Sequence, residues 1–94
     1  GRDAAGLVPD YVLLVEVNDF EATAPAPGSK EVPVHVGLTL TLLRAGDGRL
    51  LATRRLDQTA LAASTRPLDV VTAFDAATRL VLADALTWTQ RSAH

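Results

Sequence analysis

The sequence has 94 residues, of which 48% are hydrophobic and 21% charged, and its formal net charge is −2 at pH 7. This length fits one small domain or a fragment of one, and the composition is that of a globular protein. The weak acidity and the dispersed arginines provide no basic footprint, so nucleic acid is not an expected partner. Cysteine is absent, which excludes disulfides and thiolate metal sites within these residues.

The first predicted strand covers about residues 11–20. Tyr11, Leu13, Val15 and Val17 alternate with more polar neighbours, and β-branched residues are enriched. The segment 22–29 contains two prolines and a glycine among small residues, which favours an extended, protruding connection. We therefore expect a strand followed by a loop.

The second predicted strand, about residues 32–43, has the most regular pattern in the chain. Six aliphatic residues recur at every second position: Val32, Val34, Val36, Leu38, Leu40 and Leu42. Such alternation is typical of a strand with one face in the core. Pro33 cannot donate a ladder hydrogen bond, so we expect regular pairing to begin after it.

A tight hairpin is predicted at residues 45–48, where Gly46, Asp47 and Gly48 tolerate positive φ. The third strand then covers about residues 50–61 and pairs antiparallel with the second. Arg54 and Arg55 interrupt both of its faces, which suggests a bulge or a twist near them. The glycines do not form a phosphate loop, because they lead into a strand and not into a helix.

The period changes to 3.6 residues over about residues 67–90, which predicts one amphipathic helix. Its apolar stripe is expected to contain Val70, Phe74, Ala77, Val81, Ala85 and Trp88. Ser64 and Thr65 offer capping hydroxyls, and Pro67 suits the first turn. The predicted fold is thus α+β: a three-stranded antiparallel β-meander followed by one long helix packed on one sheet face, within a single domain or domain fragment, residues 1–94.

Few side chains suit catalysis or metal binding. The two histidines, His35 in a strand and His94 at the end, fall short of the ligands that a metal needs, and the serines follow no nucleophile motif. Asp19 and Glu21 are the nearest pair of carboxylates, and solvation on an exposed strand is their expected role. We expect no catalytic residue, no cofactor and no metal, and hence no enzyme.

The order of several segments resembles the C-terminal part of the ABC-type transport auxiliary lipoprotein family. The likeness rests on residues 10–13, 18–22, 48–54 and 70–77 and on Trp88, and it extends to about Gln90. It implies a non-catalytic auxiliary component of an envelope ABC transport system for lipids, which acts by docking to partner proteins or by shielding the lipid path. The implied partners are other subunits of the ABC and MCE-type machinery, with lipid as a candidate ligand. It also implies a periplasmic location, with membrane anchoring in the full-length protein through an N-terminal lipid anchor that would precede Gly1.

An apolar second sheet face independently suggests an interaction surface or a homo-oligomer contact. The residues expected there, or on the flanks of the helix, are Val12, Leu14, Leu43, Leu80 and Leu86. The other interpretation is a generic protein-interaction or assembly domain unrelated to transport. An upstream lipidated cysteine would favour the transport component, and a cytosolic Met start would favour the alternative.

Overall fold

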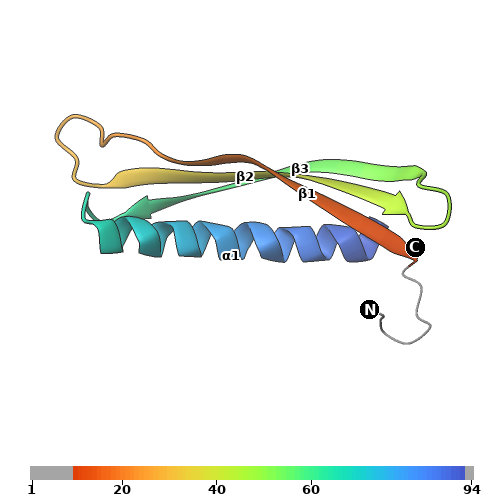
Figure 1. Cartoon of the computed structure of the whole chain (residues 1–94). Coiled ribbons are helices and arrows are strands. Elements are labelled where there is room, and N and C mark those ends of the chain that lie inside the picture. Colours follow the sequence, from red (N-terminus) through yellow and green to blue (C-terminus); the bar gives the residue numbers. More distant parts are fainter. Residues whose placement is uncertain (1–9, 93–94) are drawn as a thin grey trace.

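The computed structural model describes residues 10–92, so His94 lies outside the described residues. Three strands precede one helix: β1 (Tyr11–Ala22), β2 (Val32–Arg44), β3 (Leu50–Ala62) and α1 (Pro67–Ser92). The strands form one antiparallel sheet in the order β1-β2-β3, and α1 runs along one face of it (Figure 1). The predicted α+β meander with one long helix is confirmed, and each predicted boundary lies within two residues of the observed one.

The central strand β2 shows the expected alternation of burial. All six of its alternating aliphatic side chains are buried, with Leu40 and Leu42 at 0% exposure. The intervening residues lie on the opposite face, where His35, Thr39, Thr41 and Leu43 are half-buried. We call this opposite face the outer face, because α1 covers only the other one.

Two expectations about pairing are wrong. Val32 and Pro33 are already paired with Ala62 and Leu61 of β3, so this ladder begins before the proline and not after it. The strands also remain in register at Arg54 and Arg55, which face Leu40 and Thr39. The irregularities lie elsewhere, between Leu42 and Leu43 in the β2–β3 pair and between Val17 and Asp19 in the β1–β2 pair.

The predicted hairpin connects β2 to β3. The amide of Gly48 donates a hydrogen bond to the carbonyl of Arg44 at 2.8 Å, and the amide of Arg44 donates to the carbonyl of Arg49 at 2.9 Å. Gly48 has φ = 70°, a value that side chains with a Cβ adopt at a cost. The glycine therefore determines where the chain reverses.

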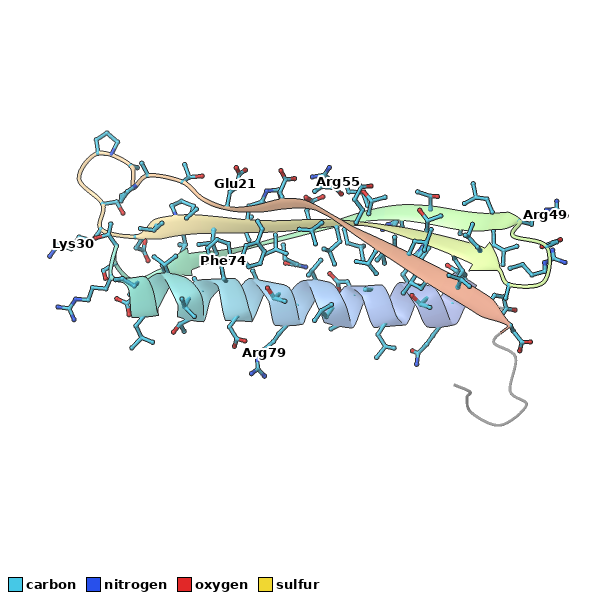
Figure 2. The ribbon with its side chains drawn as sticks, viewed as in Figure 1. Glu21, Lys30, Arg49, Arg55, Phe74 and Arg79 are labelled. Atoms are coloured by element: carbon cyan, nitrogen blue, oxygen red, sulfur yellow. The ribbon has the colours of Figure 1, made fainter. Side chains whose placement is uncertain are left out.

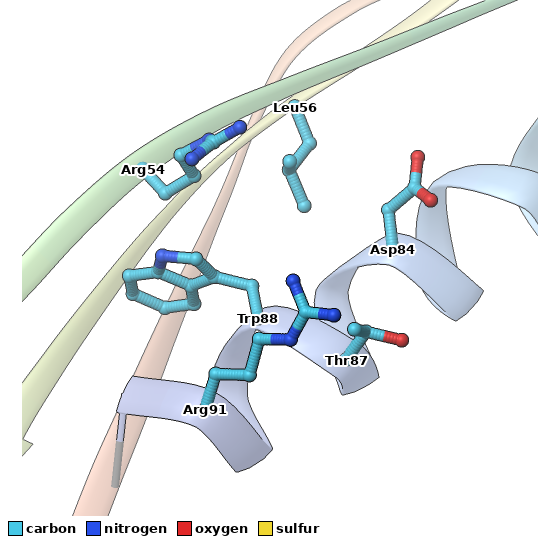
Figure 3. A pocket seen from close by; sticks show the side chains of 6 residues that line it. All are labelled: Arg54, Leu56, Asp84, Thr87, Trp88 and Arg91. Atoms are coloured by element: carbon cyan, nitrogen blue, oxygen red, sulfur yellow. The ribbon is translucent and has the colours of Figure 1, made fainter.

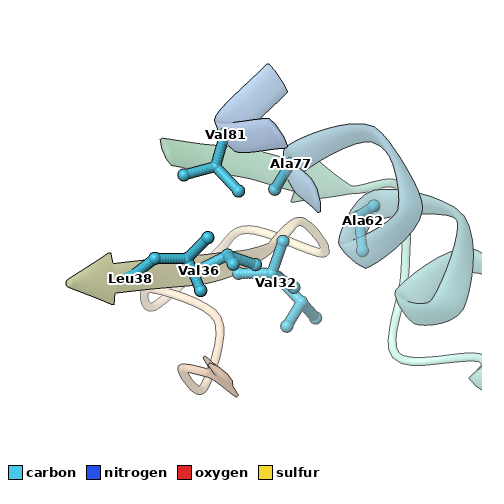
Figure 4. Close-up of a cluster of buried hydrophobic side chains, with 8 residues drawn as sticks. Val32, Val36, Leu38, Ala62, Ala77 and Val81 are labelled. Atoms are coloured by element: carbon cyan, nitrogen blue, oxygen red, sulfur yellow. The ribbon is translucent and has the colours of Figure 1, made fainter. Parts of the chain in front are cut away.

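The helix packs on the sheet through small residues. Its buried positions are Ala73, Ala77, Val81 and Ala85, spaced four residues apart, which brings the helix close to the buried side of β2 (Figure 4). Phe74, which was predicted in this stripe, is half-buried and packs against the same core, whereas the buried Ala73 was not in the predicted stripe. The ring of Phe74 stacks on Phe20 of β1, with centroids 4.4 Å apart and planes at 11°.

The start of α1 follows the predicted capping region. The hydroxyl of Ser64 donates a hydrogen bond to Asp69 at 2.6 Å and accepts one from the amide of Arg66 at 3.1 Å. Asp69 places negative charge in the first turn, where it complements the helix dipole. The Ser64 hydroxyl thus stabilises the loop before the helix and orients an acidic side chain at its N-terminus.

Candidate functional site

An apolar groove lies between β1 and α1, on the helix side of the sheet. The β1–α1 groove has a volume of about 250 Å³, and it is lined by Leu13, Val15, Leu38, Leu40, Leu82, Ala85, Leu86 and Thr89. Thr89 is the one polar side chain in this lining, and its hydroxyl donates to the carbonyl of Ala85 at 2.8 Å. The groove therefore presents almost no hydrogen-bonding group to an occupant.

The groove exists because α1 packs against β3 and β2 more than against β1. Leu13, Val15 and Val17 lie beside buried residues of β2 and face the helix side, yet they are 38%, 55% and 61% exposed. The helix therefore leaves this part of β1 largely uncovered. Near the start of the helix the Phe20–Phe74 stack does reach β1, so the open part lies beyond it.

The residues expected at an interaction surface fall in three places. Val12 and Leu43 are direct partners in the β1–β2 ladder, and Leu14 follows two residues later on the same outer face. Leu86 lines the β1–α1 groove. Leu80 lies four residues before Asp84, which hydrogen-bonds Gln58 of β3, so Leu80 belongs to the other flank of the helix.

A charged cluster occupies the middle of the outer face. The His35 cluster consists of Asp19 and Glu21 from β1, His35 from β2, and Arg55 and Asp57 from β3. Glu21 is paired across the ladder with His35, and Asp19 and Asp57 flank Gly37 from its two sides. Figure 2 shows Glu21 and Arg55 pointing away from α1. Asp19 and Glu21, predicted to be merely solvated, thus have defined partners.

The β-bulge in β1 puts the two carboxylates on this face. Before it, the odd-numbered residues Leu13 to Val17 face α1, whereas after it Phe20 and Ala22 do. One extra residue at Asn18 therefore turns Asp19 and Glu21 to the outer face. Asn18 itself accepts a hydrogen bond from the hydroxyl of Thr39.

Distances within the His35 cluster define its contacts. His35 Nε2 lies 2.7 Å from Asp57 Oδ1, and His35 Nδ1 lies 4.0 Å from both Asp19 Oδ2 and Glu21 Oε1. The guanidinium of Arg55 donates to both Asp57 and Asp19. Hydrogen bonds from Arg55 and then from His35 lower the pKa of Asp57 below its usual value. Hydrogen bonds to Asp57 and then to Asp19 raise the pKa of Arg55 above its usual value.

A second hollow, of about 340 Å³, lies on the β3 side of the helix (Figure 3). Trp88 and Leu56 provide its apolar surface, and Arg54, Arg91 and Asp84 supply charge. Trp88 is half-buried here, in agreement with its predicted place on the inward side of the helix. An ion pair joins Asp75 and Arg79, one turn apart on the exposed side of α1, at 2.8 Å.

Two solved structures share this arrangement of sheet and helix. Protein XCC0632 of Xanthomonas campestris, described as a member of the DUF330 family, superposes with a TM-score of 0.79 at 27% identity, over 89% of this chain. The second structure, described as a candidate lipoprotein of Caulobacter crescentus CB15, matches with a TM-score of 0.66 at 19% identity over 93% of this chain, and it shows the same fold.

Both neighbours are longer than the region they share with this protein. The chain spans 48% of the Xanthomonas protein and 66% of the Caulobacter protein. No protein-family model matches the sequence, and no curated protein matches it at the significance required. Among residues 10–92, no helix combines the length and the hydropathy of a membrane span.

Proposed function

We propose that this protein is a non-catalytic auxiliary component of an envelope ABC transport system for lipids and that it acts by protein–protein docking. The observation that carries the proposal is the β1–α1 groove. A contiguous apolar surface is uncommon on a small monomeric protein and usually marks a place where another segment binds. The lipoprotein description of one structural neighbour supports an envelope location.

The occupant that fits the groove is an amphipathic helix of a partner subunit, lying beside α1 on the same sheet face. The lining is apolar along both walls, so an apolar stripe of a helix would lose no hydrogen bond on entering. Leu82 and Leu86 are one turn apart on α1 and are 53% and 60% exposed, which gives such a helix two anchoring positions. Residues of β1 would form the opposite wall.

The proposal is tested with the full-length protein and the purified MCE-type substrate-binding subunit of the same transport system. We expect a stable complex that Leu86→Asp weakens at least tenfold, because a carboxylate in the groove would have to be desolvated on binding. Leu80→Asp is the matched control, since Leu80 lies on the same helix at 51% exposure but outside the groove. Co-purified lipid is identified by mass spectrometry.

Two outcomes would refute docking through the groove. Equal weakening by Leu80→Asp and Leu86→Asp would show that the contact is not in the groove. The second outcome is that Leu86→Asp alone loses much of its thermal stability, while Leu80→Asp leaves the complex unaffected. This would show that the full-length protein covers the groove with its own chain. A complex with unrelated envelope proteins but not with the transport subunit would favour the alternative, a generic assembly domain.

A further inference from the structure

The imidazole of His35 presents its two nitrogens to different partners. Nε2 lies at hydrogen-bonding distance from Asp57, and a carboxylate only accepts, so the proton of a neutral ring is on Nε2. The lone pair of Nδ1 then faces Asp19 and Glu21, whose nearest oxygens are each 4.0 Å away. This distance is too long for a hydrogen bond. Three electron-pair donors therefore converge on one region of the outer face.

The charges of the cluster are unbalanced. Asp19, Glu21 and Asp57 contribute three negative charges, whereas Arg55 contributes one positive charge. The four acid and guanidinium groups thus carry a net charge of two negative units, which one divalent cation would neutralise. The side chains are only partly exposed at His35 and Asp19, 30% each, so solvent screens this repulsion less than it does on an open surface.

We propose that His35 Nδ1, Asp19 and Glu21 form a binding site for a divalent transition-metal ion of the Zn²⁺ type. The three ligand atoms lie within 4.8 Å of one another. Zinc takes nitrogen and carboxylate oxygen ligands at about 2.0–2.2 Å, so tetrahedral ligands lie about 3.4 Å apart. Shifts of about 1 Å or less bring the carboxylates to that separation, and Glu21, 64% exposed, is free to make them.

Asp57 completes the arrangement in the manner of a carboxylate–histidine–zinc triad. It holds Nε2 and thereby fixes both the tautomer and the ring orientation, which directs Nδ1 to the other two carboxylates. Arg55 in turn fixes Asp57 through two donors. Asp57 is thus a positioning residue, and the three ligands come from β1 and β2.

Gly37 shows that the sheet accommodates this cluster at close range. A Cβ atom at this position would lie 2.7 Å from Asp57 Oδ1 and 3.0 Å from both Arg55 Nη2 and Asp19 Oδ2. A glycine inside a strand weakens the strand and often marks a close approach of other groups. Here it lets side chains of β1 and β3 meet directly above β2.

The test is calorimetric titration of the full-length protein, without an affinity tag, with Zn²⁺ alone, followed by Co²⁺ absorption spectra. We expect one equivalent to bind, and His35→Ala to lose this binding. Asp57→Asn should weaken it about 10- to 100-fold and alter the Co²⁺ spectrum. His94→Ala, which removes the other histidine, is the matched control and should bind as the unmodified protein does.

Three results would overturn the site. The unmodified protein could fail to bind Zn²⁺, which would refute the site directly. His35→Ala could retain binding, or His94→Ala could abolish it, and either would place the ion elsewhere. If His35→Ala fails to fold, Glu21→Gln replaces it, because Glu21 is exposed, and unchanged binding in that variant would equally refute the site. None of these results depends on the proposed transport role.

Discussion

The packing of α1 is tested most directly by truncating Val81, which is 0% exposed and sits in the buried stripe between Ala77 and Ala85. Val81→Ala removes two carbon atoms, about 0.8 kcal/mol each for transfer alone, and leaves a cavity that raises the cost. We expect a loss of about 2–3 kcal/mol. A domain of 94 residues has a free energy of unfolding of about 5–14 kcal/mol, so the variant still folds.

The neighbouring Leu80 is the matched control. Leu80→Ala removes three carbon atoms, one more than Val81→Ala, but the side chain is 51% exposed, so we expect a loss of about 1 kcal/mol. Thermal unfolding followed by circular dichroism measures both. At about 4–8 °C per kcal/mol, Val81→Ala should lower Tm by about 10–20 °C and Leu80→Ala by less than half as much. If the larger truncation at Leu80 costs as much as that at Val81, the assigned helix phase is wrong.

Three further predictions concern the outer face and the hairpin. Gly37→Ala should displace the flexible ends of the charged side chains above β2 and abolish Zn²⁺ binding while leaving Tm within a few degrees, and a well-formed site in its crystal structure would contradict this. Because the pKa of Asp57 is lower in the folded protein than in the unfolded chain, its contribution to stability is present above pH 4 and lost as the pH falls through the folded value. Metal-free Asp57→Asn should therefore show a weaker decline of stability in acid titrations, and an identical decline would refute this link. Gly48→Ala should destabilise by about 1 kcal/mol in urea unfolding because of the positive φ, and an unchanged midpoint would be inconsistent with the turn described.

The fold could be predicted from the sequence because its signals are local. The alternation in β2 and the change of period at Pro67 each depend on neighbouring residues alone, and they established the elements and their order. The apolar stripe of α1 was predicted from its period, and Phe74 packs against the core as expected. The burial of Ala73, which the predicted stripe omitted, depends on how closely the helix approaches the sheet.

The candidate sites could not be predicted in the same way. They depend on the register between the strands and on where α1 lies across the width of the sheet. Asp19 meets His35 only because a bulge at Asn18 turns the end of β1 over, and no composition signal identifies that bulge. Arg55 and Asp57 are two residues apart in β3 and therefore share one face of that strand. This spacing was the one sequence signal that β3 contributes charged side chains to the His35 cluster. Likewise, the pattern showed that Val15 faces the helix, but only the structure shows that the helix lies too far towards β3 to cover it.

The position of β1 at the edge of the sheet has a consequence for the dynamics of the protein. Most of its neighbours belong to β2, whereas β2, β3 and α1 also hold one another. A strand held chiefly by one ladder can open without unfolding the rest, as a separate cooperative unit in native-state hydrogen exchange. Its amides should therefore exchange earlier than those of β2. A segment bound in the groove would contact β1 and suppress its local unfolding. Binding would therefore be measured as slower hydrogen exchange of the β1 amides.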